Sequence, residues 1–303
     1  MDRREPERWT DVSSESAPRA VAVNVAANTN EPGFRGPVYP DGSFTYVPIP
    51  ESATTLPRDR FPVDEPIPTY ADLDLPFSVP EDLRRTSVHM DPEFPGVHGR
   101  NHATYGDPFA VKAGPIGELE PGDWLLFYAT LTLRPSDWRG PGGGRIDDGE
   151  DADAAEATDA ADAVEAANAT DHRDGEWLQS HASVDIADDL APDWGAYLFA
   201  GIRVSTVVSE PDREVATDLA PTNAHCKRDP FDARVVVVGD PAASGPFERV
   251  VPLSTPESGS EANRLVTEHS SDSGNGPWWR RPLRFDPAST AELLDRVRWA
   301  RDD

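Results

Sequence analysis

Proline restricts the fold of this chain more than any other residue, because 31 of its 303 residues are proline and another 22 are glycine. Proline lacks a backbone donor and interrupts helix interiors, and both residues are typical of turns. We therefore expect many turns and short strands, and few long helices. Compact apolar runs agree with this expectation and predict buried strands at 20–26, 124–131, 194–208 and 234–240.

These segments predict a mainly β fold of the α+β type, either a curved sheet or a small β-barrel decorated by long loops. Residues 44–50 alternate as a further short strand, and the proline-punctuated segment 51–80 is expected to lie extended over the surface. The segment from Ser289 to Arg301 is amphipathic, with Leu293, Leu294 and Val297 at helical spacing. It predicts a C-terminal helix.

Composition changes divide the chain into three parts. Residues 1–18 are polar and charged and predict a disordered lead, and residues 19–303 predict a single domain. That domain is interrupted at about 140–176 by a stretch of glycine, alanine, aspartate and glutamate. Such a stretch buries too little apolar surface to order itself, so it predicts a disordered acidic insertion.

The formal net charge is −27, and the only lysines are Lys112 and Lys227. Excess acid with little lysine is typical of haloarchaeal-type proteins, which stay soluble where salt screens charge. In such a halophilic protein acidic residues cover the whole surface. The negative charge therefore does not exclude nucleic-acid binding, although such binding usually needs a basic face. A single cysteine, Cys226, excludes an internal disulfide. No apolar run reaches membrane-spanning length, so we expect a cytoplasmic protein without a membrane partner.

Several motifs together resemble the nucleotide modification-associated domain 3 family over about residues 20–255. They are NTNEPGFRGPVYPDG at 28–42, YVPIPE at 46–51, VHMDPEF at 88–94, TYGD at 104–107, GDWLLFYA at 122–129 and NAH at 223–225. The resemblance implies a role with nucleic-acid bases or nucleotides, alongside protein components of a modification system. The strand at 122–129, followed by 196–208, also resembles the PUA, ASCH and EVE barrels in pattern, which implies a PUA-like fold that holds a modified base.

The first candidate site lies at His89, Asp91 and Glu93, which alternate along the chain. On an extended segment they point to one side, where they can share acid–base work or hold a metal. Pro92 breaks ideal strand geometry, and the alternative is a loop whose side chains bind their own backbone. The spacing is not distinctive, and no Cys/His zinc set or glycine-rich phosphate loop is present, so we assign no metal and leave the cofactor unknown.

Two further groups have the chemistry of base recognition. Tyr105 and Asp107 lie in a predicted turn, where the ring can stack on a base and the carboxylate can accept from its amine. Asn28, Asn30 and Arg35 lie in a predicted loop, where amides can pair with a base edge and arginine can bind phosphate. Packing of the tyrosine and the shaping of turns explain the same residues without a ligand.

Asn223, His225, Lys227 and Arg228 form a locally basic cluster with a histidine. These side chains can contact phosphate or supply a general acid, and the alternative is a solvated β-turn before the next strand.

The sequence favours the first of three functional hypotheses, a binding module for modified bases or nucleotides, and leaves the other two as alternatives. A reader of modified bases predicts an aromatic-walled pocket lined by Asn28, Arg35, Tyr105, Asp107, Asn223 and His225. An enzyme acting on a base or nucleotide predicts that carboxylates and histidines from distant segments converge, with His89, Asp91, Glu93 and His225 as candidates. A scaffold predicts that the acidic insertion binds a partner protein.

Overall fold

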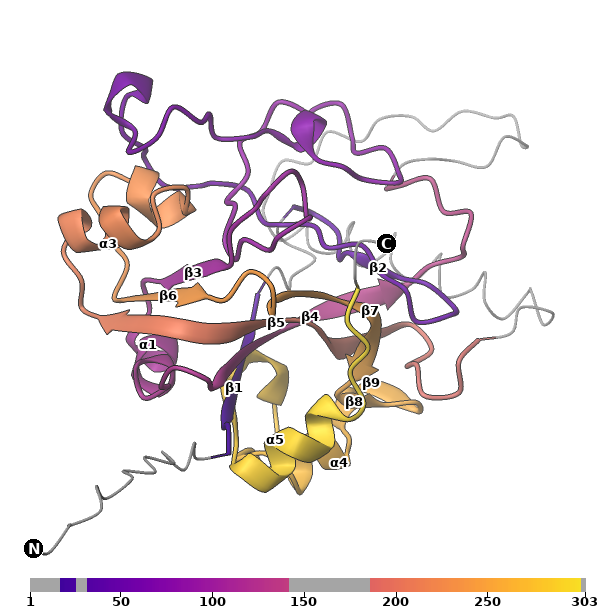
Figure 1. The fold of residues 1–303 in the computed structure, drawn as a ribbon. Helices are drawn as coiled ribbons and strands as arrows, with labels where there is room; N and C mark the ends of the chain where they lie inside the picture. Colours follow the sequence, from indigo (N-terminus) through magenta and orange to yellow (C-terminus); the bar gives the residue numbers. More distant parts are fainter. Residues whose placement is uncertain (1–16, 26–31, 142–185, 301–303) are drawn as a thin grey trace, which may run out of the picture.

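The computed structural model describes residues 17–25, 32–141 and 186–300, and it is mainly β (Figure 1). Its strands are β1 Ala20–Asn24, β2 Pro37–Val38, β3 Thr104–Asp107, β4 Trp124–Leu133, β5 Trp194–Ser209, β6 Val235–Gly239, β7 Gly245–Pro252, β8 Ser254–Thr255, β9 Ser258–Ala262 and β10 Leu283–Phe285. Its helices are α1 Ala110–Gly117, α3 Arg213–Leu219, α4 Arg264–Thr267 and α5 Pro287–Leu294, with 3-10 turns η1 Arg58–Arg60, η2 Tyr70–Asp72, η3 Ala224–Lys227 and η4 Trp278–Arg280. Among the described residues, no helix is both long and apolar enough to cross a membrane.

The predicted lead at 1–18 and the acidic insertion at about 140–176 lie almost entirely outside the described residues. Both therefore stay predictions, and so does the scaffold hypothesis that depends on the insertion.

Eight strands form one mixed sheet in the order β10-β1-β4-β5-β6-β3, with β2 on β4 and β7 on β5. Strands β1 and β2 run parallel to β4, whereas the other pairs are antiparallel. The path does not close, because β10 and β3 end it without pairing to each other. The predicted mainly β class is confirmed. Of the two predicted architectures, a curved sheet and a small barrel, the barrel is wrong.

The central strand β4 divides the core into two. Every one of its residues is buried, as expected for a continuous apolar run in a sheet covered on both faces. Leu125 and Phe127 belong to one apolar cluster, whereas Leu126 and Tyr128 belong to the other. Because side chains alternate along a strand, each face of the sheet has its own core.

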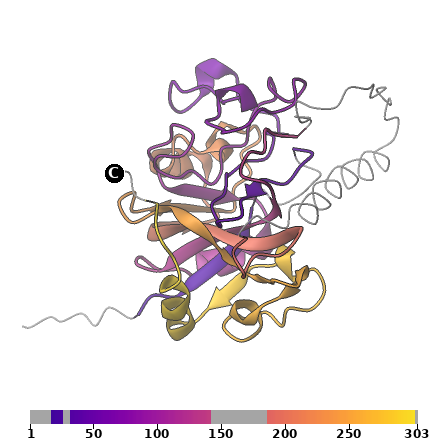
Figure 2. The same ribbon diagram turned by 90° about the vertical axis from the view of Figure 1, so that its right-hand side faces the viewer.

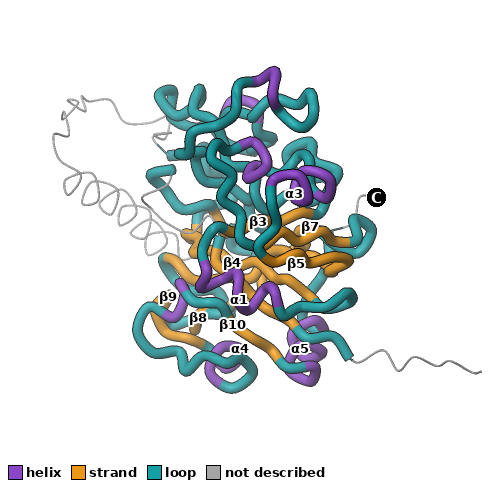
Figure 3. Tube along the Cα trace, turned by 90° about the vertical axis from the view of Figure 1, so that its left-hand side faces the viewer, coloured by secondary structure: helices purple, strands orange, loops and turns teal. Residues whose placement is uncertain are grey.

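The loop layer, residues 39–103 between β2 and β3, covers one face of the sheet, and the C-terminal elements cover the other. Figures 2 and 3 show the loop layer, drawn in purple and in teal respectively, on the side opposite α4 and α5. Within it, the strand predicted at 44–50 is wrong, because only isolated bridges form there, from Phe44 to Val38 and from Pro50 to Val88. Prolines 48 and 50 lack the N–H groups that a ladder needs.

The C-terminal helix α5 is present but shorter than predicted. Asp286 caps it, since its carboxylate accepts from the Ser289 N–H at 2.8 Å and Pro287 follows at the first helical position. The helix ends at Leu294, and after a turn residues 298–300 bond to the backbone of β7. There Trp299 stacks on Trp124, with ring centroids 5.0 Å apart.

Tyr128→Phe tests the link between the central strand and the C-terminal elements. The buried Tyr128 hydroxyl donates to the Arg281 carbonyl at 2.6 Å. Removing it is expected to lower the free energy of unfolding by about 1 kcal/mol. Urea denaturation followed by tryptophan fluorescence measures this change, and an unchanged midpoint would contradict the proposed role of the hydroxyl.

Candidate functional site

A cavity of about 550 Å³ lies where the loop layer meets the end of β1, strand β3, the start of α1 and turn η3. Its volume is in the range of small-molecule sites. Histidine and carboxylate side chains line it together with Lys112 and the ring of Phe109.

Three side chains from distant segments converge on the wall of this cavity. His89 and Asp91 come from the loop layer, and His225 comes from η3. Each offers one possible ligand atom, and these atoms lie within 4.8 Å of one another. All three residues are more than nine-tenths buried. Histidines and a carboxylate far apart in sequence therefore meet, as the enzyme hypothesis requires.

Carboxylates orient both imidazole rings. His89 Nδ1 lies 2.7 Å from Glu51 Oε2, and His225 Nδ1 lies 2.6 Å from Asp232 Oδ1. Arg228 joins the two carboxylates, because its guanidinium donates to Glu51 Oε1 at 2.8 Å and to Asp232 Oδ2 at 2.8 Å. This arrangement engages Nδ1 of each ring and leaves each Nε2 for a ligand.

Asp91 is oriented through one of its two oxygens. Its Oδ1 accepts from the Gly106 N–H at 2.9 Å and from Asn223 Nδ2 at 2.6 Å. Its Oδ2 lies 3.8 Å from His225 Nε2. The Asn223 side chain also accepts from the His225 N–H at 3.0 Å, so one amide positions both members of this pair.

Burial shifts the protonation of these groups. Burial lowers the pKa of His89 to about 4, against the opposing effect of its hydrogen bond to Glu51. Burial raises the pKa of Asp91 to about 7, although the charge of His225 and the hydrogen bond from Asn223 oppose the shift. Burial acts to raise the pKa of Glu51 as well, but hydrogen bonds from His89 and Arg228 lower it to about 2. Such clustered shifts are typical of functional sites.

The predicted base-reading pair lines the same cavity, but in a different conformation. Tyr105 and Asp107 lie in strand β3, so the predicted turn is wrong. The Tyr105 hydroxyl donates to Asp107 Oδ2 at 2.6 Å, and Lys112 Nζ lies 3.3 Å from the same oxygen. The neighbouring Phe109 residue is 65% exposed. Tyr105 and Asp107 are buried, so Phe109 is the exposed aromatic residue beside this pair.

The other predicted binding residues are distributed differently. Asn28 and Asn30 lie outside the described residues. Arg35 does not line the cavity, since its guanidinium lies 4.7 Å from the centre of the Trp194 ring. The segment from Asn223 to Arg228 is buried in and around η3, so the solvated-turn interpretation is wrong.

Glu93 lies outside the cluster that His89 and Asp91 form. It is fully buried, and its Oε2 accepts from the hydroxyls of Thr104 and Thr222, both at 2.7 Å. Burial raises its pKa. Glu93 therefore ties the loop layer to β3 and to the segment before η3.

Glu93→Gln is expected to reduce the pH dependence of stability. Because the pKa of folded Glu93 is raised above the ordinary value of 4.5, its contribution is complete below pH 4.5 and is lost as the pH rises through the folded pKa. Glutamine stays neutral and removes that loss. Urea denaturation of both proteins from pH 4.5 to pH 8 should give a shallower decline for the variant, and parallel curves would contradict the prediction.

Sequence reasoning missed three residues that shape this site. Glu51 and Asp232 orient the imidazoles, and Gly106 lets His225 approach β3, since a Cβ there would lie 2.7 Å from His225 Cδ2. Glu51 closes the motif YVPIPE, and Gly106 lies within TYGD. Those motifs were the available signal, but no spacing relates them to the histidines.

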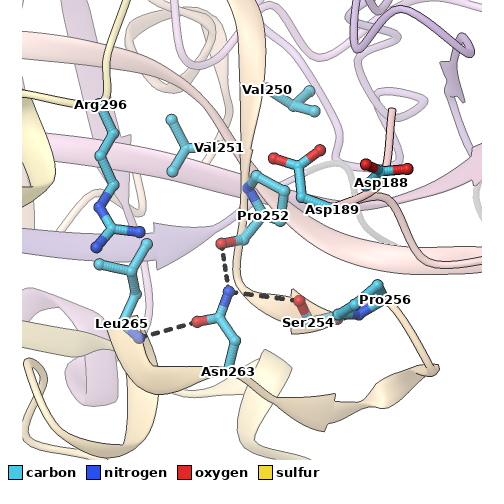
Figure 4. Close-up of a pocket in the computed structure, with 10 residues that line it drawn as sticks. All are labelled: Asp188, Asp189, Val250, Val251, Pro252, Ser254, Pro256, Asn263, Leu265 and Arg296. Atoms are coloured by element: carbon cyan, nitrogen blue, oxygen red, sulfur yellow. Dashed lines mark hydrogen bonds between the residues drawn. The ribbon is translucent and has the colours of Figure 1, made fainter. Parts of the chain in front are cut away.

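A second cavity of about 470 Å³ lies beside β7 and α4 (Figure 4). Its central polar residue, Asn263, donates to the Pro252 carbonyl at 2.7 Å and accepts from the Leu265 N–H at 2.9 Å. The amide is therefore engaged by its own loop. No histidine lines this cavity, so the first cavity is the stronger candidate.

Comparison with known proteins gives one match. The family described as nucleotide modification associated domain 3 matches residues 19–295. Searches of curated proteins and of solved structures found no match. The PUA-like resemblance and the haloarchaeal character stay predictions.

Proposed function

The chain belongs to the nucleotide modification associated domain 3 family, and we propose that it is an enzyme acting on a nucleic-acid base or nucleotide bound in the 550 Å³ cavity. The family description places the domain in the context of nucleotide modification. The observation that carries the proposal is the convergence of His89, Asp91 and His225 on the cavity wall.

These three groups have the arrangement that reactions on bases need. The two imidazoles, each oriented by a carboxylate, and the buried carboxyl group of Asp91 can activate water or another nucleophile. They can do so by proton transfer or through a bound metal. Asp91 and His225 already lie within 3.8 Å of each other. A purely structural pair has no need of a cavity large enough for a ligand.

The cavity favours the base over the phosphate of a nucleotide. Phe109 is exposed at the cavity, and an exposed aromatic ring can stack on any base. The nearby cations are already neutralised, because Lys112 pairs with Asp107 and Arg228 pairs with Glu51 and Asp232. A base or nucleoside moiety therefore fits this lining better than a bare phosphate.

Recognition of a modified base without turnover is the second candidate. The exposed ring of Phe109 at the cavity favours it. Tyr105 and Asp107 favour it less, because they are hydrogen-bonded to each other.

Mass spectrometry of nucleosides tests the proposal and separates the two candidates. Genomic DNA and total RNA would be compared between wild type, a deletion strain, and deletion strains complemented with wild-type protein, Asp91→Asn or His269→Gln. His269 packs near Glu292, 3.5 Å away, and does not line the cavity, so His269→Gln is the matched control.

An enzyme predicts that a nucleoside accumulates or disappears in the deletion strain, that wild type and His269→Gln restore its level, and that Asp91→Asn does not. If genomic and RNA nucleosides are unchanged in the deletion strain and the purified protein retains an unusual nucleoside, recognition without turnover is supported instead of an enzyme. Equal complementation by Asp91→Asn and wild type would overturn the assignment of the reacting groups to this cluster.

A further inference from the structure

We propose that His89, Asp91 and His225 bind one divalent first-row transition metal ion, with open coordination positions toward the cavity. This inference deepens the proposed function, on which its catalytic meaning rests, but the ion site itself stands on geometry. Two imidazoles and one carboxylate are the facial set that proteins use for metals with exchangeable positions.

The spacing of the donor atoms suits one ion. Metal–nitrogen and metal–oxygen bonds are about 2.0–2.2 Å, so two donors on one ion lie at most about 4.2 Å apart. Asp91 Oδ2 and His225 Nε2 are 3.8 Å apart. The longest separation in the cluster is within 4.8 Å, so a small closing movement of side chains brings every donor to bonding distance.

Each ligand residue has one polar atom fixed by the protein and another left over. The Nδ1 atoms of His89 and His225 face Glu51 and Asp232. Such carboxylate–histidine pairs fix the tautomer and direct Nε2 to a metal. Asp91 Oδ1 is held by Gly106 and Asn223, leaving Oδ2.

The remaining atoms are available to a ligand in the cavity. Within the described part of the chain no hydrogen bond reaches either Nε2 or Asp91 Oδ2, and Asp91 Oδ2 lies 3.8 Å from His225 Nε2. All three residues line the cavity, and their free atoms are not among the buried polar atoms without a partner. One cation at the cavity wall would contact all three atoms at once.

The local charge also favours a cation. The cluster contains the carboxyl group of Asp91 and is surrounded by those of Glu51, Asp107 and Asp232, whereas two cationic side chains lie nearby, Lys112 and Arg228. A divalent ion offsets this excess. Calcium and magnesium prefer all-oxygen ligands, whereas imidazole suits zinc, iron, cobalt and nickel.

Three protein ligands point to a catalytic rather than a structural site. Structural zinc sites are closed by four protein ligands, whereas catalytic sites keep a position for water or substrate. Cys226 and Glu93 do not belong to the set of residues whose donor atoms converge here. The open positions therefore face the cavity in which a base is proposed to bind.

Zinc and cobalt binding by the purified full chain tests the proposal. The protein would be stripped with a chelator, titrated with Zn²⁺ by calorimetry, and loaded with Co²⁺ for visible absorption spectroscopy. About one ion per chain is expected, with a cobalt spectrum of nitrogen and oxygen coordination. Asp91→Asn and His225→Ala should weaken zinc binding by about 100-fold or more, since loss of an orienting residue alone costs about 10–100-fold.

His269→Gln is the control, because it removes an imidazole that lies near Glu292 rather than in the cluster. It should bind zinc as wild type does. Equal zinc affinity in wild type and Asp91→Asn would assign binding to the acidic surface and overturn the proposed site. Absence of zinc binding by wild type would also overturn it. Thermal unfolding with and without zinc shows whether each variant is folded. The ion should raise the melting temperature of wild type and His269→Gln but not of Asp91→Asn.

These readouts need no substrate, so they separate the metal site from the proposed function. If Asp91→Asn loses zinc binding but nucleosides are unchanged in the deletion strain, the metal site is supported and the proposed enzymatic function is rejected. If nucleosides are altered in the deletion strain but the protein binds neither zinc nor cobalt, the metal site is rejected and an acid–base enzyme is supported.

Discussion

Arg228→Met is expected to lower the free energy of unfolding by about 3–5 kcal/mol, the range for breaking a buried ion pair by removing one partner. Arg228 donates through Nε and Nη2 to Glu51, whose side chain is only 3% exposed, and through Nη1 to Asp232. Methionine fills much of the volume but leaves the Glu51 carboxylate buried without its charge partner. Chemical denaturation measures the change.

Arg234→Met is the matched control. The side chains of Arg234 and Glu210 are both largely exposed, and Arg234 Nη1 lies 3.7 Å from Glu210 Oε1. Exposed ion pairs contribute about 0–1 kcal/mol to the free energy of unfolding. The double variant Glu51→Gln/Arg228→Met should recover part of the loss, since it removes the unpaired carboxylate. Equal effects of Arg228→Met and Arg234→Met would contradict the central role of Arg228.

The same pair predicts an acid dependence of stability. Because the pKa of folded Glu51 is lowered from 4.5 to about 2, its stabilising contribution is present above pH 4.5 and is lost as the pH falls toward 2. Without Arg228 the lowering is smaller, so Arg228→Met should lose less stability than wild type over this interval. A steeper loss in the variant would be inconsistent with this account.

The strands that sequence analysis predicted are those whose signal is local. Strands β4, β5 and β6 are long apolar runs bounded by turn residues, and their predicted limits agree with the structure to within about two residues. The pairing of β1 parallel to β4 has no local signal, because residues about a hundred positions apart decide it. An open sheet and a closed barrel therefore could not be distinguished from these runs.

The candidate site divides in the same way. His89, Asp91 and His225 were identified because their residue types and motifs are visible in the chain. Their convergence is what the enzyme hypothesis required, but no local pattern indicates it, because it depends on contacts such as Asp91 with Asn223, which are 132 residues apart. Glu51 was missed for the same reason, since its bond to Arg228 spans 177 residues.

Glu93 illustrates the opposite error. Alternation along an extended chain predicts that it points to the same side as His89 and Asp91. The loop does not keep strand geometry through Pro92, and the Glu93 carboxylate instead binds Thr104 and Thr222. A period of two has predictive value only where a regular strand exists.

Gly106→Ala is expected to weaken zinc binding at the proposed site by about 10-fold or more and to destabilise the fold by about 1–3 kcal/mol. An added Cβ would lie 2.7 Å from His225 Cδ2 and 3.3 Å from Asn223 Oδ1. The ring cannot move freely, because His225 is 1% exposed and its Nδ1 is bound to Asp232. The methyl group must therefore displace either the imidazole or strand β3.

Gly114→Ala is the control for this substitution. Gly114 lies in helix α1, and apart from its chain neighbours and the backbone of its own helix no heavy atom lies within 4 Å of the position of an added Cβ. Alanine there should leave zinc affinity unchanged and change the free energy of unfolding by less than about 1 kcal/mol, because its helix propensity is opposed by the contact of its Cβ with Pro115. Calorimetric titration and urea denaturation of both variants give the comparison.

The direction of any displacement distinguishes the two ways in which the protein can respond. Gly106 also holds Asp91 through its N–H and pairs with Val236 in β6. If β3 moves, both Asp91 and His225 lose their positions, and zinc affinity should fall as far as in Asp91→Asn. If only the imidazole yields, the loss should be smaller. Full zinc affinity in Gly106→Ala would mean that the approach of His225 to β3 is not required for the site.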